Sequence, residues 1–259
     1  MKPTTLRLDR LLANLGYGSR REVGQMIAAG LVAGDHGRLR DPGERVAITA
    51  DLPQRLRVNG APLDPPPPLT LILHKPLGVV CSHSEPGRSV YELLPPRWRR
   101  RDPVLSTIGR LDSDTSGLLL VTDDGALLHR VISPRRHVTK RYLATLARPL
   151  QGHEGAVFAA GDLVLEGDTA PLAPAVLEAL SPTTAYLTVT EGRYHQVRRM
   201  FAAVSNHVVA LHRDRVGGLA LPEALDPGAF EIASPDHLDA VFRVTATDST
   251  MAGVSRTQG

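Results

Sequence analysis

The sequence predicts an α+β protein of two domains: a small N-terminal αα-β unit and a larger domain that mixes helices with strands. Three observations support this fold class. Leucines recur at helical spacing before Gly16, four consecutive prolines occupy residues 65–68, and strand-like apolar runs alternate with helical segments after them. A chain of 259 residues, 42% of them hydrophobic, is long enough to bury a sizeable core.

The small N-terminal domain is expected to open with two helices. The first carries a leucine stripe, made of Leu8, Leu11, Leu12 and Leu15. The second begins at Ser19, which forms a capping-box pattern with Glu22, and ends near Ala29, where Gly30 supplies a left-handed stop. Short strands are expected to follow at residues 31–32, 46–48 and 55–58.

The proline run divides the chain. Consecutive prolines lack backbone donors and favour an extended, semi-rigid conformation, so we expect a linker. A proline-rich recognition ligand is the rival interpretation, which the adjoining strand disfavours. We therefore expect a small basic domain at 1–62, a linker at 63–68, the larger domain at 69–244, and a disordered polar tail at 245–259.

In the larger domain, apolar runs and turn residues predict alternating elements. Strands are expected at residues 69–74, 79–82, 118–122, 141–146, 185–190 and 208–211. Helices are expected at residues 126–132 and 196–204. The turn between the first two strands contains Pro76 and Gly78.

Composition excludes several classes of protein. Cys81 is the only cysteine, which rules out a disulfide framework and a cysteine-rich zinc module. No apolar run approaches the length of a membrane span or of a signal core. We therefore expect a soluble, cytoplasmic monomer with no membrane partner.

The charge is concentrated in the first quarter of the chain. Residues 1–60 hold ten Lys or Arg and six Asp or Glu, a net charge of +4, whereas the whole chain carries +3. Lysine occurs only three times, so the basic residues are mostly arginine. Arginine suits planar contacts to phosphates and bases, although a compositional bias explains this preference equally well.

The densest cluster of polar residues is segment 109–120, which places Asp112 and Asp114 just before an apolar strand. Three interpretations compete. One is a calcium loop whose twelfth position is Asp123, disfavoured because an apolar strand interrupts it. Another is structural, with Asp114, Thr115 and Ser116 bonding their own turn. The third makes Asp112 a catalytic carboxylate with Arg110 beside it.

Three further segments are rich in basic residues. Segment 191–201 combines three arginines with Tyr194, His195 and Gln196, groups that bind phosphates and stack on bases. In segment 135–142, basic residues precede a predicted strand that carries Tyr142. Segment 97–101 is predicted to be a solvated loop that touches an RNA backbone at most.

Other known sequence signatures are absent. The chain has no glycine-rich phosphate loop, no dinucleotide fingerprint and no zinc-protease motif. Its ten histidines do not follow metal-ligand spacing. We therefore expect no cofactor and no metal.

Taken together, these motifs resemble a known family. Segments 109–118, 140–142 and 191–201 are similar to the signatures of RNA pseudouridine synthases, and segment 75–82 resembles their first strand-turn-strand. Segments 133–137 and 206–218 favour the ribosomal small-subunit pseudouridine synthase A type over large-subunit relatives. Residues 5–60 resemble a small RNA-binding domain shared with a small-subunit ribosomal protein, although residues 32–37 depart from its usual strand and turn.

The resemblance implies a catalytic domain built on a largely antiparallel sheet. It also implies an enzyme that flips a uridine of 16S ribosomal RNA out of its stack and converts it to pseudouridine. The substrate would be the RNA or a small-subunit assembly intermediate. Large-subunit (23S) RNA is the alternative target, and a non-catalytic ribosome-assembly protein is the alternative function. A glycoside hydrolase with paired carboxylates is a weaker third hypothesis.

By the same resemblance, Asp112 is the catalytic carboxylate, Arg198 pairs with it, and Tyr142 stacks on the target base. Arg110 would enter the gap that the flipped base leaves. The remaining residues expected to bind RNA are Arg20, Arg21, Lys140, Arg193 and His195.

Overall fold

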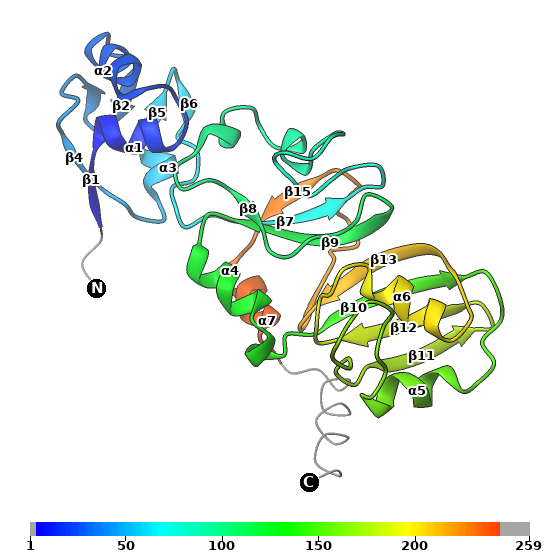
Figure 1. Ribbon diagram of the computed structural model, residues 1–259. Helices are drawn as coiled ribbons and strands as arrows, with labels where there is room; N and C mark the ends of the chain where they lie inside the picture. The colour runs from blue at the N-terminus through cyan, green and yellow to red at the C-terminus, as the bar shows by residue number, and fades with distance from the viewer. Residues whose placement is uncertain (1–3, 244–259) are drawn as a thin grey trace. The chain divides into compact units, whose positions relative to one another are not determined.

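The computed structural model describes residues 4–243 (Figure 1). Contacts divide these residues into two compact units. The first comprises residues 4–70, 91–106 and 122–125, and the second comprises 71–90, 107–121 and 126–243. The limits expected for the domains, 1–62, 63–68 and 69–244, stay predictions. The tail expected at 245–259 falls outside the described residues.

The first unit is built from short elements around a leucine core. Its helices are α1 (Leu8–Asn14), α2 (Arg20–Ala28) and α3 (Leu52–Arg55). Its strands are β1 (Thr5–Arg7), β2 (Val32–Gly34), β3 (Gly37–Leu39), β4 (Arg45–Ala47), β5 (Arg57–Val58) and β6 (Ala61–Pro62). Strands β1 and β4 pair with each other, and the other four form a sheet in the order β3-β2-β5-β6.

Local sequence signals explain the two helices of this unit. The leucine stripe of α1 is fully buried, together with Val23 and Ile27 of α2. Ser19 accepts a hydrogen bond from the Glu22 amide at 3.3 Å, and Glu22 accepts from the Ser19 amide at 2.7 Å, which confirms the capping box. Gly30 has φ +74°, which confirms the left-handed stop. Because apolar spacing and caps act within one or two turns, the sequence alone specified these helices.

Segment 97–101 is not the solvated loop that its charge predicts. It contains a 3-10 turn, Trp98–Arg100, in which Trp98 is buried. Arg97 pairs with Asp64 at 2.6 Å, and the Arg101 side chain is fully buried against Asp123 at 3.0 Å. The chain approaches so closely that a Cβ on Gly16 (φ +83°) would lie 2.3 Å from the Arg97 carbonyl oxygen. Trp98 and Arg101 therefore belong to the interior of the first unit, whereas Arg97, Arg99 and Arg100 remain exposed, so the segment is solvated only in part.

The second unit contains a nine-stranded sheet. Its order is β11-β12-β10-β13-β9-β7-β15, with β14 beside β13 and β8 beside β9. The strands are β7 (Thr70–Lys75), β8 (Ser106–Thr107), β9 (Thr115–Thr122), β10 (Lys140–Leu146), β11 (Val176–Ser181), β12 (Thr184–Val189), β13 (Val208–Val216), β14 (Leu219–Ala220) and β15 (Phe230–Ile232). The pairing of β10 with both β12 and β13 is antiparallel, whereas β13 and β9 are parallel. This agrees with the expected mixed domain on a largely antiparallel sheet.

Two helix pairs form separate cores on this sheet (Figure 1). The helices are α4 (Gly125–Ile132), α5 (Glu154–Ala160), α6 (Gln196–Ala203) and α7 (Pro235–Val241). Phe158 of α5 meets Phe201 of α6 edge to face at 5.4 Å, over β10 to β13. Helices α4 and α7 pack with Ile72, Leu118 and Leu120 of β7 and β9. Among the described helices, none combines the length and apolar character that crossing a bilayer requires.

One expected strand is wrong. Residues 79–82 form only an isolated bridge, between Val80 and Ser89. After the Pro76 turn, the Gly78 amide donates to the Ser113 carbonyl at 2.7 Å, so the chain leaves the sheet and lies against the loop before β9. The sequence analysis also missed α5, α7, β11 and β15.

Candidate active site

The second unit contains a cleft of about 1410 Å³. The loop before β9, the start of β10, the turn before α6 and the middle of β13 line it. Seven of the nine predicted site residues line this cleft: Arg110, Asp112, Lys140, Tyr142, Arg193, His195 and Arg198. The other two, Arg20 and Arg21, lie on α2 of the first unit. There Arg20 pairs with Asp9. A hydrogen bond from Arg7 lowers the pKa of Asp9 to about 2, and Arg20 contributes to the same shift.

Asp112 lies in the loop immediately before β9. Its side chain is 35% exposed, and its Oδ1 lies 3.3 Å from Nε2 of His195. The buried Lys75 holds this loop in place. Its ammonium donates to the carbonyls of Pro76, Asp112 and Thr115 at 2.9–3.0 Å. All three protons of the ammonium are therefore used. Burial lowers the pKa of Lys75. Sequence reasoning missed this residue, although it opens segment 75–82.

A glycine allows β9 to approach its parallel neighbour. Gly117 has φ +115°, and a Cβ at this position would lie 2.1 Å from the Arg213 carbonyl oxygen. Gly117 pairs with Arg213 across the parallel ladder. The close approach of the two strands therefore depends on the missing side chain, and it brings the Asp112 loop next to β13.

The expected pairing of Arg198 with Asp112 is wrong in this structure. Arg198 Nη2 lies 2.8 Å from Asp114 Oδ2 and also donates to the Asp114 carbonyl. Its Nη1 donates to the Val208 carbonyl at 2.9 Å. From the first turn of α6, the guanidinium thus joins the Asp112 loop to β13. Asp112 faces His195 instead.

Arg110 does not lie beside the Asp112 carboxylate as expected. Its guanidinium pairs with Glu85, and both side chains are largely exposed. The turn-capping interpretation of this loop is also wrong, because the Asp114 and Ser116 side chains bond to Arg198 and His212 on other elements.

The calcium interpretation is excluded as well. Its third carboxylate, Asp123, pairs with Arg101 in the first unit. Over residues 4–243, no group of three or more His, Cys, Asp or Glu side chains could hold a metal ion.

The floor of the cleft combines an aromatic ring with cations. The Tyr142 hydroxyl lies 3.5 Å from Nη1 of Arg213, whose guanidinium carbon is 5.9 Å from the ring centre. Arg213 is buried and donates to the Leu118 carbonyl at 2.9 Å. Burial and the nearby charge of Arg213 lower the pKa of Lys140 to about 8, while Glu191 opposes this shift. Arg213 is a site residue that sequence reasoning did not single out.

The turn before α6 is held by its own arginines. Arg193 donates to Glu191, Asp168 and the carbonyls of Ala170 and Pro171. These bonds use four of the five N–H groups that a guanidinium offers, which leaves Arg193 little capacity for phosphate. Hydrogen bonds from Arg199 and Arg193 lower the pKa of Asp168. Through these bonds, Arg193 of the turn and Arg199 of α6 hold segment 166–171 against the start of the helix.

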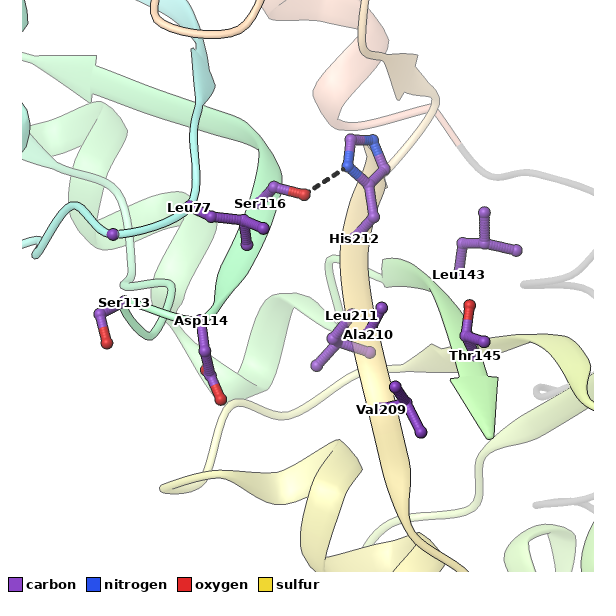
Figure 2. Close-up of a pocket in the computed structure, with 11 residues that line it drawn as sticks. Leu77, Ser113, Asp114, Ser116, Leu143, Thr145, Val209, Ala210, Leu211 and His212 are labelled. Carbon is purple, nitrogen blue, oxygen red and sulfur yellow. Dashed lines mark hydrogen bonds between the residues drawn. The ribbon is translucent and has the colours of Figure 1, made fainter. Parts of the chain in front are cut away.

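A second cavity, of about 570 Å³, borders the Asp112 loop. Figure 2 shows Ser113 and Asp114 on one side of it and Val209, Ala210 and Leu211 on the other. At its edge, Ser116 Oγ lies 2.9 Å from Nδ1 of His212. Burial, and to a lesser extent the neighbouring His74, lowers the pKa of His212. The mainly apolar lining makes this cavity a poorer site for a charged substrate than the cleft.

The cleft is suited to a planar, anionic substrate. Its lining offers the Asp112 carboxylate, the half-buried aromatic ring of Tyr142, and cations that include Lys140 and Arg213. The other carboxylates of the lining, Glu85, Asp114 and Glu191, pair with Arg110, Arg198 and Arg193. A carboxylate that is not committed to an arginine can act as a nucleophile or take a proton. Tyr142 supplies a surface on which a base can stack.

Comparison with known proteins agrees with this geometry. The family model described as RNA pseudouridylate synthase matches residues 70–203, and the S4 domain model matches residues 6–51. Ribosomal small subunit pseudouridine synthase A of Escherichia coli K12 is 40% identical over 240 residues, covering 91% of this chain and 100% of that protein. The protein of the same name from Vibrio cholerae is 36% identical and covers 92% and 100%.

A solved structure supports the same conclusion. A crystal structure of a pseudouridylate synthase aligns with a TM-score of 0.63 at 32% identity, covering 91% of this chain and 99% of that one. The motifs, the sheet and both family matches agree. The chain belongs to the RNA pseudouridylate synthase family, as an RNA-modifying isomerase that carries an N-terminal S4 domain.

Proposed function

We propose that this enzyme converts a specific uridine of 16S ribosomal RNA to pseudouridine. The observation that carries the proposal is the placement of Asp112 with Tyr142 in one cationic cleft. The full-length similarity to proteins named for the small subunit supports the choice of RNA.

Asp112 acts as the catalytic carboxylate in this proposal. The target uridine leaves its stack and enters the cleft, where Tyr142 stacks on the flipped base. The ionised Asp112 attacks the sugar or the base, or removes a sugar proton, and the N1–C1′ glycosidic bond breaks. The base then rotates, C5 forms the new bond to C1′, and the proton on C5 is lost while N1 gains one, so the reaction is a net isomerisation. His195, 3.3 Å from Asp112, orients the carboxylate. Arg198 acts at a distance from Asp112, because it holds the loop through Asp114.

The remaining cations bind the RNA. Arg20 and Arg21 of the S4 domain contact phosphates, and Lys140 does so at the cleft. Arg110 leaves Glu85 to fill the gap that the flipped base vacates. We assign Arg193 to positioning, because its guanidinium is occupied by acceptors of the protein.

Mapping of pseudouridines tests the substrate. Purified enzyme is incubated with naked small-subunit RNA, with large-subunit RNA and with a partly assembled small subunit, and each new pseudouridine is located by chemical modification and primer extension. A single new site in small-subunit RNA, free or assembled, is the expected result. Modification of large-subunit RNA alone would overturn the 16S assignment.

Substitutions at Tyr142 separate the ring from its hydroxyl. We expect Tyr142→Ala to slow single-turnover conversion by about 5- to 100-fold, the range of one lost base stack. Tyr142→Phe keeps the ring and loses only the long contact to Arg213, so a smaller loss is expected. Equal losses in the two variants would contradict the stacking role.

The pKa of Lys140 predicts a pH dependence of RNA binding. Lys140 is charged below a pKa of about 8 and becomes neutral above it, so affinity should fall as pH rises from 7 to 9, by up to about tenfold per pH unit above the pKa. Lys140→Arg stays charged, and its affinity should change less over the same range. The dissociation constant is measured at each pH in the inactive Asp112→Asn background. Identical pH profiles would show that Lys140 does not contact the RNA.

A further inference from the structure

Tyr194 is an exposed aromatic side chain at the edge of the catalytic cleft. It lines the cleft and is 77% exposed. The other phenylalanine, tyrosine and tryptophan side chains of residues 4–243 are buried or half-buried. A single exposed ring is common on protein surfaces and indicates nothing by itself. Tyr194 is distinguished by its place in the lining of the cleft and by its stack on His195.

One face of the Tyr194 ring is already stacked. It lies on the imidazole of His195 with the ring centres 3.9 Å apart and the planes inclined by 16°. That imidazole is in turn 3.3 Å from the Asp112 carboxylate. The three groups are therefore in sequential contact: Asp112 meets the edge of the imidazole at Nε2, and Tyr194 covers one face of the same ring. Because the ring is 77% exposed, its second face is open to solvent.

The backbone beneath the ring is held in place. The Tyr194 carbonyl accepts a hydrogen bond from Nη1 of Arg199 at 3.2 Å, and Arg193 is anchored by four bonds to the protein. His195 adopts a left-handed conformation with φ 48°, which sets the direction of the next turn. A tyrosine on a fixed backbone has only two side-chain torsions to restrict, so it binds with a small loss of entropy.

We propose that the open face of Tyr194 stacks on an unpaired base of the substrate RNA, next in the strand to the target uridine. This inference rests on the proposed function, since it takes Asp112 as the point where the target nucleotide reacts. Because only His195 separates Tyr194 from Asp112, a nucleotide whose sugar reaches Asp112 has its strand neighbour within reach of the open face of Tyr194. Single-stranded or looped RNA is recognised mainly by such stacking on aromatic side chains.

A stacking residue at this position favours a particular kind of substrate. Bases in a regular duplex have both faces covered, so they cannot use Tyr194 without further unstacking. The enzyme should therefore prefer a target uridine that lies in a loop, bulge or opened helix.

Binding measurements test the stack. The probe is a small-subunit RNA fragment that contains the mapped uridine, with variants that lack the base on either side of it. All proteins carry Asp112→Asn, so the RNA stays unmodified. We expect Tyr194→Ala to weaken binding by about 5- to 100-fold and Tyr194→Phe by less than about twofold. The matched control is Leu180→Ala on β11, which removes a half-exposed apolar side chain outside the cleft and should bind normally.

The RNA lacking the stacked base gives the decisive comparison. On that RNA, Tyr194→Ala should cause little further loss, because both partners of one contact are already gone. The proposal fails if Tyr194→Ala binds normally, if Tyr194→Phe loses as much as Tyr194→Ala, or if the loss is equal on every abasic RNA. Activity of the unmutated enzyme on the same fragment separates the two claims. An active enzyme with a normal Tyr194→Ala variant overturns the stack alone. Failure of the 16S assignment appears instead in the mapping experiment, as modification of large-subunit RNA alone, and the stack is then tested in the same way on a fragment of that RNA.

Discussion

Asp112→Asn is expected to reduce pseudouridine formation by at least about a thousandfold, the scale of loss when a catalytic group that forms or breaks a bond is removed. An amide can neither attack the sugar or base nor accept a proton at neutral pH. The fold should persist, because the loop is held through backbone carbonyls that Lys75 bonds, including that of Asp112 itself. RNA binding should persist as well, since removal of a negative charge does not weaken attraction to phosphate.

Three measurements check this result together: tritium release from labelled uridine in a ribosomal transcript, the thermal unfolding midpoint, and RNA affinity. Asp162→Asn is the matched control, because it removes the same charge from an exposed position of the second unit that does not line the cleft. It should keep full activity. Full activity in Asp112→Asn would end the assignment of Asp112 as the catalytic carboxylate.

Much of the fold could be predicted because its signals are local. The capping box of Ser19 and Glu22 lies within one helical turn, and Gly30 ends the same helix. The apolar run before Asp123 specified β9 to within three residues. Such patterns act through near neighbours in the chain, where spacing alone decides which face is buried. Helix α5 was missed because, unlike α1, which is equally short and also uncapped, it has no leucine stripe to mark its buried face.

The partners of the site residues could not be predicted in the same way. Resemblance indicated Arg198 as the partner of Asp112, but the folded chain sets it on Asp114, which is 84 residues away in sequence. Arg193 looked like an RNA ligand until the structure placed Asp168 and Glu191 around it. A basic side chain has the same local sequence signal whether it faces phosphate or a distant carboxylate. Only the tertiary structure distinguishes the two, and for Arg193 it supports a positioning role.

Segment 97–101 is the clearest case, and it leads to the largest expected effect on stability. Replacing the fully buried Arg101 by methionine should lower the free energy of unfolding of the first unit by about 3–5 kcal/mol, because Asp123 would remain as an uncompensated buried charge. Arg101 also donates to the Pro65 carbonyl at 2.9 Å, so a second acceptor loses its partner. Urea unfolding followed by tryptophan fluorescence reports on this unit, since Trp98, the only tryptophan of the chain, is buried within it.

Two comparisons separate the ion pair from a general effect of losing an arginine. Arg99 is exposed in the same 3-10 turn, and Arg99→Met should change stability by less than about 0.5 kcal/mol. Adding Asp123→Asn to Arg101→Met removes the stranded charge and keeps an oxygen to accept from the Leu69 amide, which bonds Asp123 at 2.7 Å. The double variant should therefore be more stable than Arg101→Met alone. Equal unfolding midpoints for Arg99→Met and Arg101→Met would show that the buried pair contributes no stability, and the basic run would then be the solvated feature that its composition suggests.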